Sequence, residues 1–184
     1  MKPGTIIFQG KSKSGKDLVF RYPANEDLQM LRDYINTLSK EKTFIIFQGE
    51  QVSLKEEKIY LDSQLKTIAK GKAVQLLAFS EGKLAGNTQI NLKDKATKHI
   101  GVFGISLAKE FRSEGIGFLL MEKIIEEAKQ NLKGLKIITL ELFGNNEIAG
   151  KLYKKMGFIE FGNLPKGIIY RDTPVNHIYM FKEV

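Results

Sequence analysis

Apolar residues recur along the chain with two different spacings, and these spacings separate predicted strands from predicted helices. Apolar positions three or four residues apart predict helices over residues 25–38, 53–69, 116–132 and 146–157. Short runs rich in β-branched and aromatic residues predict strands over residues 5–9, 17–22, 73–80, 84–92, 99–107, 136–143, 158–162, 167–171 and 177–182. Residues 43–51, between the first two helices, are compatible with a loop or a short strand.

Capping residues predict where these helices begin and end. Asn25 is the expected cap of the first helix, and Ser53 to Glu56 read as a capping box for the second. Gly134 is a stop signal for the third helix, and Gly157 would end the fourth in a left-handed conformation. The expected apolar positions of the second helix are Ile59, Leu61, Leu65 and Ile68.

The order of these elements predicts the fold class. Strands, two helices, a hairpin and then strand-helix-strand-helix-strand favour an α/β protein with a central mixed sheet and helices on both faces. The chain contains no internal repeat, low-complexity segment or interdomain linker, so residues 1–184 are expected to form a single domain.

Composition narrows the class of protein further. The chain has 42% hydrophobic and 27% charged residues, as a globular domain does. The absence of cysteine excludes disulfides, thiolate metal sites and a cysteine nucleophile, and two well-separated histidines argue against zinc, so no metal is expected. No apolar run approaches the roughly 20 residues of a membrane span, and the N-terminus does not resemble a signal peptide. We therefore expect a cytoplasmic protein without a membrane partner.

The net charge of +8 is compatible with several kinds of partner. Lysines are scattered over most segments, and neither a long basic run nor an arginine-rich arm is present. This distribution favours a solvated surface that attracts a polyanionic cofactor, and it does not favour nucleic acid.

Two glycine-bearing segments are candidate anion sites. Arg112 to Gly117 lie between a predicted strand and a predicted helix, where unpaired amides at the positive end of the helix dipole favour a phosphate or pyrophosphate. Gly10, Gly15 and Lys16 match the start of a phosphate-binding P-loop pattern. Asp17 replaces the required hydroxyl, however, and a strand follows instead of a helix, so a hairpin turn is the preferred interpretation.

Two motifs in the second half of the chain occur together. R-x-x-G-x-G over residues 112–117 is followed by N-x-x-A-x-x-L-Y-x-x-x-G-F, met by Asn146, Ala149, Leu152, Tyr153, Gly157 and Phe158. Residues 99–158 therefore resemble the GNAT N-acetyltransferase superfamily. The resemblance implies a GNAT-like fold in which the parallel strands over 99–107 and 136–143 splay apart, and it implies acetyl-CoA as co-substrate.

The resemblance also implies roles for individual residues. The backbone of Ile105, Ser106 and Leu107 would pair with the pantetheine arm, and the Leu107 amide would polarise the acetyl carbonyl. Asn146 would hydrogen-bond the cofactor arm, and Tyr153 would face the cofactor sulfur as general acid. The pyrophosphate would be held by the amides of Arg112, Ser113, Glu114, Gly115, Ile116 and Gly117.

Each role has a plainer alternative. Tyr153 could be an aromatic residue at the edge of the core, Asn146 could be only a helix cap, and the side chain of Arg112 could lie in solvent. The general base stays open among water, backbone carbonyls and the side chains of His99, Glu110, Glu141 and His177.

The implied activity is acetyl transfer to a primary amine by direct attack, on a small molecule or on a peptide or protein. The alternative function is a non-catalytic module that binds acyl-CoA as a sensor. The resemblance does not fix the acceptor or the oligomeric state, for which a homodimer is one option.

Overall fold

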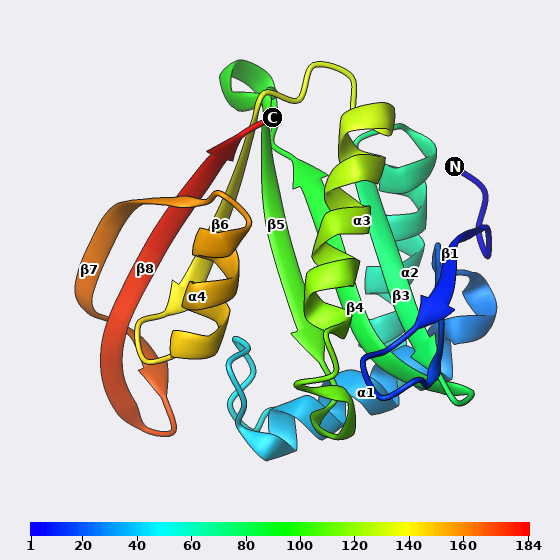
Figure 1. The fold of residues 1–184 in the computed structure, drawn as a ribbon, viewed down its shortest axis with the longest axis horizontal. Helices are drawn as coiled ribbons and strands as arrows, with labels where there is room; N and C mark the ends of the chain where they lie inside the picture. Colours follow the sequence, from blue (N-terminus) through cyan, green and yellow to red (C-terminus); the bar gives the residue numbers. More distant parts are fainter.

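The computed structural model describes residues 1–184 and contains one eight-stranded sheet and four α-helices (Figure 1). The helices are α1 (Leu28–Glu41), α2 (Leu54–Ala69), α3 (Ile116–Asn131) and α4 (Glu147–Lys155). The strands are β1 (Ile6–Lys11), β2 (Asp17–Arg21), β3 (Ala73–Ser80), β4 (Lys83–Leu92), β5 (Ile100–Leu107), β6 (Ile137–Phe143), β7 (Ile159–Tyr170) and β8 (Thr173–Glu183). None of the helices combines the length and the hydropathy that a bilayer crossing needs.

The sheet is mixed, with the strand order β1-β2-β3-β4-β5-β6-β8-β7. All neighbouring strands are antiparallel except β5 and β6. Successive side chains of a strand point to opposite faces. Leu76 of β3 accordingly packs in the larger core with α3, whereas Leu77 packs in the smaller core with α1 and α2. The predicted α/β class with helices on both faces is confirmed, and Figure 1 shows α3 and α4 in front of the sheet with α2 behind it.

The two parallel strands separate partway along their length. Only three residue pairs join β5 to β6, and the last of them is Val102 with Thr139. Beyond this point β5 stays paired with β4 as far as Leu107, while β6 stays paired with β8 as far as Phe143. The sheet therefore opens into a V between β5 and β6, which confirms the predicted splay.

The C-terminal strands differ from the prediction. Three short strands were expected, but two long strands, β7 and β8, are present. The register of β7 against β8 shifts between Glu160 and Gly162 and again between Leu164 and Ile168. These irregularities interrupt the alternation of apolar and polar residues without ending the strand, and sequence patterns do not distinguish the two cases.

Of the two predicted helix starts, the cap at Asn25 is wrong and the capping box at Ser53 to Glu56 is present. Asn25 is not a helix cap, because residues 25–27 form a 3-10 turn in which Asp27 accepts hydrogen bonds from the Ala24 amide and from Arg21. The capping box of α2 is confirmed by hydrogen bonds in both directions between Ser53 and Glu56.

The buried face of α2 is more polar than the sequence indicated. The prediction that Ile59 lies on this face is wrong, because the residue is 62% exposed. The buried residues of the helix are Glu57, Leu61, Gln64 and Ile68. A carboxylate and an amide thus occupy positions that would ordinarily be apolar.

Candidate functional site

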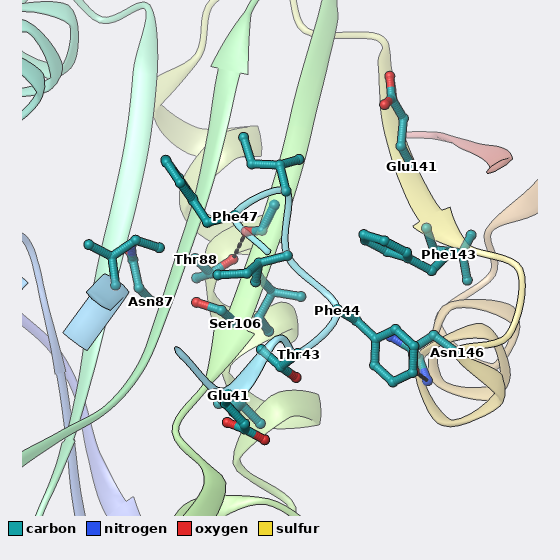
Figure 2. A pocket seen from close by; sticks show the side chains of 18 of the residues that line it. Glu41, Thr43, Phe44, Phe47, Asn87, Thr88, Ser106, Glu141, Phe143 and Asn146 are labelled. Atoms are coloured by element: carbon teal, nitrogen blue, oxygen red, sulfur yellow. Dashed lines mark hydrogen bonds between the residues drawn. The ribbon is translucent and has the colours of Figure 1, made fainter. Parts of the chain in front are cut away.

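A cavity of about 1290 Å³ lies where β5 and β6 diverge. Figure 2 shows Thr88 and Ser106 on one side of it, and Phe44, Phe143 and Asn146 on the other. Eight of the predicted site residues line this cavity, namely Ile105, Ser106, Leu107, Arg112, Ser113, Gly117, Asn146 and Tyr153. Glu114, Gly115 and Ile116 do not line it. The two sequence motifs therefore converge on one space.

The end of β5 is held from several directions. The Tyr34 hydroxyl of α1 lies 3.0 Å from Ser106 Oγ. The Ala108 amide donates to the Ala85 carbonyl at 2.9 Å, on the β4 side. Because neighbouring amides of a strand point to opposite edges, the Leu107 amide points toward the gap between β5 and β6.

The side chain of Arg112 is engaged with the protein, so the alternative that it lies in solvent is wrong. Its guanidinium donates to the Leu107 carbonyl from Nε at 3.1 Å and from Nη2 at 3.0 Å. Nη2 also donates to Glu41 Oε2 at 2.9 Å, and Nη1 pairs with Oε1 of the same carboxylate. Arg112 therefore joins the end of α1, the end of β5 and the turn before α3.

The turn before α3 packs against the loop that joins β1 and β2. The Glu114 carboxylate accepts hydrogen bonds at 3.2 Å from Ser12 Oγ and from the Ser14 amide, and the Lys13 amide donates to the Glu114 carbonyl at 3.0 Å. Hydrogen bonding to Ser14 and Ser12 lowers the pKa of the Glu114 carboxyl. The hairpin interpretation of residues 10–16 is confirmed, and amides of this loop bind a carboxylate of the protein.

Gly115 and Gly117 satisfy different geometric requirements. Gly115 caps α3 with φ of +79°, a left-handed conformation, and a Cβ there would lie 3.2 Å from Lys13 Cγ. A Cβ at Gly117 would lie 3.3 Å from Leu107 Cδ1 and 3.7 Å from Leu152 Cδ2. Gly117 therefore allows the first turn of α3 to approach β5 and α4, and Ile116 beside it is buried in the core.

Asn146 and Tyr153 reach the cavity from α4. Asn146 is the cap of this helix, and its Oδ1 accepts the Ala149 amide at 3.2 Å. Tyr153 is only 7% exposed and packs edge-on against Phe103, with ring centroids 6.1 Å apart. Burial raises the pKa of Tyr153 to about 12, so its phenol is protonated at neutral pH. Gly157 ends the helix with φ of +82°, the left-handed conformation expected from the sequence.

Sequence patterns missed one charged residue that lines the cavity and one pairing between two others. His177 of β8 and Glu141 of β6 were considered singly, but their pairing, with Nε2 and Oε2 3.1 Å apart, was not predicted. The Tyr179 hydroxyl lies 3.0 Å from Nδ1 of the same imidazole. Glu41 was missed because it lies 71 residues from its partner Arg112 and carries no motif.

Aromatic side chains close one side of the cavity. Phe44, from the loop between α1 and α2, stacks on Tyr170 with ring centroids 4.5 Å apart and meets the edge of Phe143 at 5.8 Å. All three rings line the cavity. No group of three or more His, Cys, Asp or Glu side chains is arranged to bind a metal ion.

Comparisons with known proteins agree with this geometry. Residues 33–158 match the family model described as "Acetyltransferase (GNAT) family". The structure is similar to the acetyltransferase of GNAT family from Streptococcus pneumoniae, with 29% identity, a TM-score of 0.81 and coverage of 91% of this chain and 99% of that chain.

Two further solved structures share the fold. The ribosomal-protein-alanine N-acetyltransferase from Brucella melitensis has 20% identity and a TM-score of 0.79 over 90% of this chain and 99% of that chain. The protein yncA from Salmonella typhimurium, solved with its cofactor acetyl-CoA, has 12% identity and a TM-score of 0.78 over 90% of this chain and 93% of that chain.

Proposed function

The chain belongs to the GNAT acetyltransferase family, and from this premise we propose that it transfers the acetyl group of acetyl-CoA directly to a primary amine. The observation that carries the proposal is the convergence of eight predicted site residues on one cavity at the opening between β5 and β6. The acceptor is a small-molecule amine or an amine of a peptide or protein.

The residues at this opening fit acetyl-CoA, which when bound supplies the acetyl thioester. The edge of β5 beyond Val102 is not paired with β6, so the Ile105 backbone and the Leu107 amide are free to pair with the pantetheine arm. Ser113 and Gly115 have left-handed conformations, and the first amides of α3 have no partner within the helix. Amides arranged in this way favour a pyrophosphate. The Asn146 carboxamide lines the same cavity and is available to the cofactor arm.

The proposed reaction forms a C–N bond and breaks a C–S bond, so one proton leaves the amine nitrogen and one proton reaches the sulfur. The Leu107 amide would stabilise negative charge that develops on the carbonyl oxygen. The Tyr153 phenol would protonate the departing thiolate, and its position in the cavity supports this role.

The proton lost by the amine requires an acceptor on the protein or in water. Glu141 and His177 are the proposed pair, because both line the cavity and the Glu141 carboxylate lies beside the imidazole, where it would stabilise the charge of an imidazolium. Both belong to the β6 and β8 side of the opening, opposite the end of β5.

A panel of primary amines incubated with enzyme and acetyl-CoA tests the proposed function. We expect free thiol to be released in an amine-dependent manner and the product mass to rise by one acetyl group. Reactions without amine control for hydrolysis. Binding of CoA without amine-dependent thiol release would identify a non-catalytic acyl-CoA-binding module, and products acetylated only on oxygen would contradict amine transfer.

A further inference from the structure

Three connections between elements meet at the end of the sheet that lies away from the cavity. They are residues 70–72 between α2 and β3, residues 93–99 between β4 and β5, and residues 132–136 between α3 and β6. The Leu92 amide donates to the Lys72 carbonyl and the Lys136 amide donates to the His99 carbonyl, each at 2.9 Å, so the three connections adjoin one another. Figure 1 shows them at the top of the molecule, whereas β5 and β6 diverge toward the bottom.

These connections carry most of the excess positive charge of the chain. Seven lysines and one aspartate within them give +6 of the formal net charge of +8. All seven lysines are exposed, and we call the surface that they form the basic end: Lys70, Lys72, Lys93, Lys95, Lys98, Lys133 and Lys136. Only Lys72 has a salt bridge, to Asp94 at 3.0 Å. The lysines are scattered along the sequence, which argued against a basic binding surface, but the fold gathers them.

Helix dipoles explain only part of this charge. Lys70 and Lys133 follow the C-termini of α2 and α3, where a cation is favoured. The other five lysines lie in connections at strand ends, and the dipoles of strands are small. Glu183 and Val184 of the β8 end lie beside Lys136 but form no salt bridge with it. Six unpaired ammonium groups on one surface repel one another, so a polyanion that neutralises them is favoured.

The side chains of the basic end favour one kind of polyanion, a phosphodiester backbone. A lysine ammonium neutralises a phosphate as a point charge, without the paired geometry by which arginine reads base edges. The three connections contain no Phe, Tyr or Trp, so they offer no platform on which unpaired bases would stack. Their two leucines, Leu132 and Leu135, are buried and half-buried, so no large apolar side chain is available to enter a bilayer.

We propose that the basic end binds the phosphate backbone of double-helical nucleic acid through charge, without reading its sequence. None of the seven lysines lines the cavity, so duplex binding and the proposed acetyl transfer would use separate surfaces. A bound duplex would leave the opening between β5 and β6 free for acetyl-CoA and the acceptor. The inference does not depend on the proposed acetylation.

Fluorescence anisotropy with short labelled RNA and DNA duplexes of arbitrary sequence tests this proposal. Saturating CoA is present throughout, so that the duplex phosphates do not occupy the proposed pyrophosphate site. We expect dissociation constants of about 10⁻⁴ to 10⁻⁶ M at physiological salt, and a logarithm of the association constant that falls linearly with the logarithm of the salt concentration. A preference for one of the two duplexes would support the proposal and identify the nucleic acid.

Two triple variants locate the binding surface. The first replaces three unpaired lysines of the basic end: Lys93→Gln, Lys98→Gln and Lys136→Gln. Its salt dependence should be less steep by about 3, one for each phosphate contact that is lost. The control replaces three exposed lysines from other parts of the surface: Lys40→Gln, Lys55→Gln and Lys83→Gln. The control should keep the slope of the wild type, and both variants should keep its CoA affinity.

Several results would overturn the proposal. These are equal salt dependence in the wild type and the basic-end variant, or no binding of either duplex at low salt. Duplex binding that occurs only without CoA would place the backbone at the cofactor turn instead. Vesicles of phosphatidylcholine and phosphatidylserine provide the last comparison, because binding to them without binding to either duplex would identify a membrane-binding surface and exclude the nucleic acid.

Discussion

Arg112 is a residue of the first motif, and its side chain contacts parts of the protein that lie outside that motif. The motif identified its position before α3 but not its contacts with Glu41 and the Leu107 carbonyl. A planar guanidinium satisfies both acceptors at once, whereas a lysine ammonium is a point charge that does not reproduce the paired geometry. The side chain therefore stabilises the turn before α3, whose amides face the proposed pyrophosphate site.

Replacement of Arg112 by lysine should loosen this turn while it preserves the charge. We expect Arg112→Lys to lose about 1–2 kcal/mol of stability, because one or two partly buried hydrogen bonds are lost, and to bind CoA several-fold more weakly. Urea denaturation and calorimetry measure the two effects. Arg32→Lys is the control, since Arg32 has a similar side-chain exposure, 31% against 34%, and lies outside the cavity. Equal CoA affinity in Arg112→Lys and wild type would show that the backbone alone forms the site.

Tyr153 combines packing with an available phenol. The Tyr153→Phe variant retains the ring that packs on Phe103, so its fold and CoA affinity should survive. The saturated rate of acetyl transfer should fall by about 10²- to 10⁴-fold, as is typical when a general acid is lost. If the purified variant melts like the wild type and reacts at an undiminished rate, Tyr153 is a packing residue and water protonates the thiolate.

The alkaline stability of the same variant provides a second measurement. The pKa of Tyr153 is about 12 in the folded protein and about 10 in an unfolded chain, so the folded state binds more protons between these values. The contribution of Tyr153 to the free energy of unfolding is complete below pH of about 10, and it is lost as the pH rises toward about 12. In Tyr153→Phe, the free energy of unfolding should therefore fall by about 1–3 kcal/mol less over this pH range than in the wild type. If the free energy of unfolding falls with rising pH as steeply in Tyr153→Phe as in the wild type, burial of the phenol is contradicted.

At the scale of elements, the β1–β2 hairpin supports the turn before α3. The hairpin was predicted from the sequence, but its position was not, because Ser12 and Glu114 are 102 residues apart. The Ser12 hydroxyl is buried and contacts both Glu114 and the Lys16 amide. The hairpin therefore fixes the backbone on which the proposed pyrophosphate site depends.

Removal of the Ser12 hydroxyl should reveal this support. We expect Ser12→Ala to lose about 1–3 kcal/mol of stability, because two partly buried hydrogen bonds are lost, and to weaken CoA binding several-fold. The exposed Ser63 of α2 provides the control variant, Ser63→Ala. CoA affinity equal to that of the wild type, in a folded but destabilised Ser12→Ala protein, would mean that the hairpin only covers the edge of the sheet.

Helices and strands were predicted from the sequence more accurately than the contacts between distant side chains. Local periodicity identified β3 and β4 and the four helices, because each depends on residues close together in the chain. The bulges in β7 and the polar buried face of α2 were not predicted, since both depend on what packs opposite. For the site, the motifs and the family resemblance identified eight residues that line one cavity, whereas the pairing of His177 with Glu141 required knowledge of the strand order.

At the scale of the whole molecule, the loop between α1 and α2 joins the two halves of the divided sheet. Arg171, in the turn between β7 and β8, donates from its amide to Gln48 Oε1 and from Nε to the Lys42 carbonyl, each at 3.2 Å. Phe44 of the same loop stacks on Tyr170. These contacts cross the opening between β5 and β6 and bound the cavity beside β6 and β8, the strands that carry the proposed proton acceptors Glu141 and His177.

Loss of the Phe44 ring should therefore affect the acceptor more than CoA. The stack contributes about 0.5–1.5 kcal/mol beyond its buried area, so Phe44→Ala should be modestly destabilised and its loop less ordered. We expect KM for the amine to rise several-fold, because part of the acceptor wall is no longer fixed, while CoA affinity measured by calorimetry changes little. Phe161→Ala is the control, because this ring of β7 is 59% exposed and does not line the cavity. A fall in CoA affinity with an unchanged amine KM would mean that the loop orders the cofactor side of the opening instead.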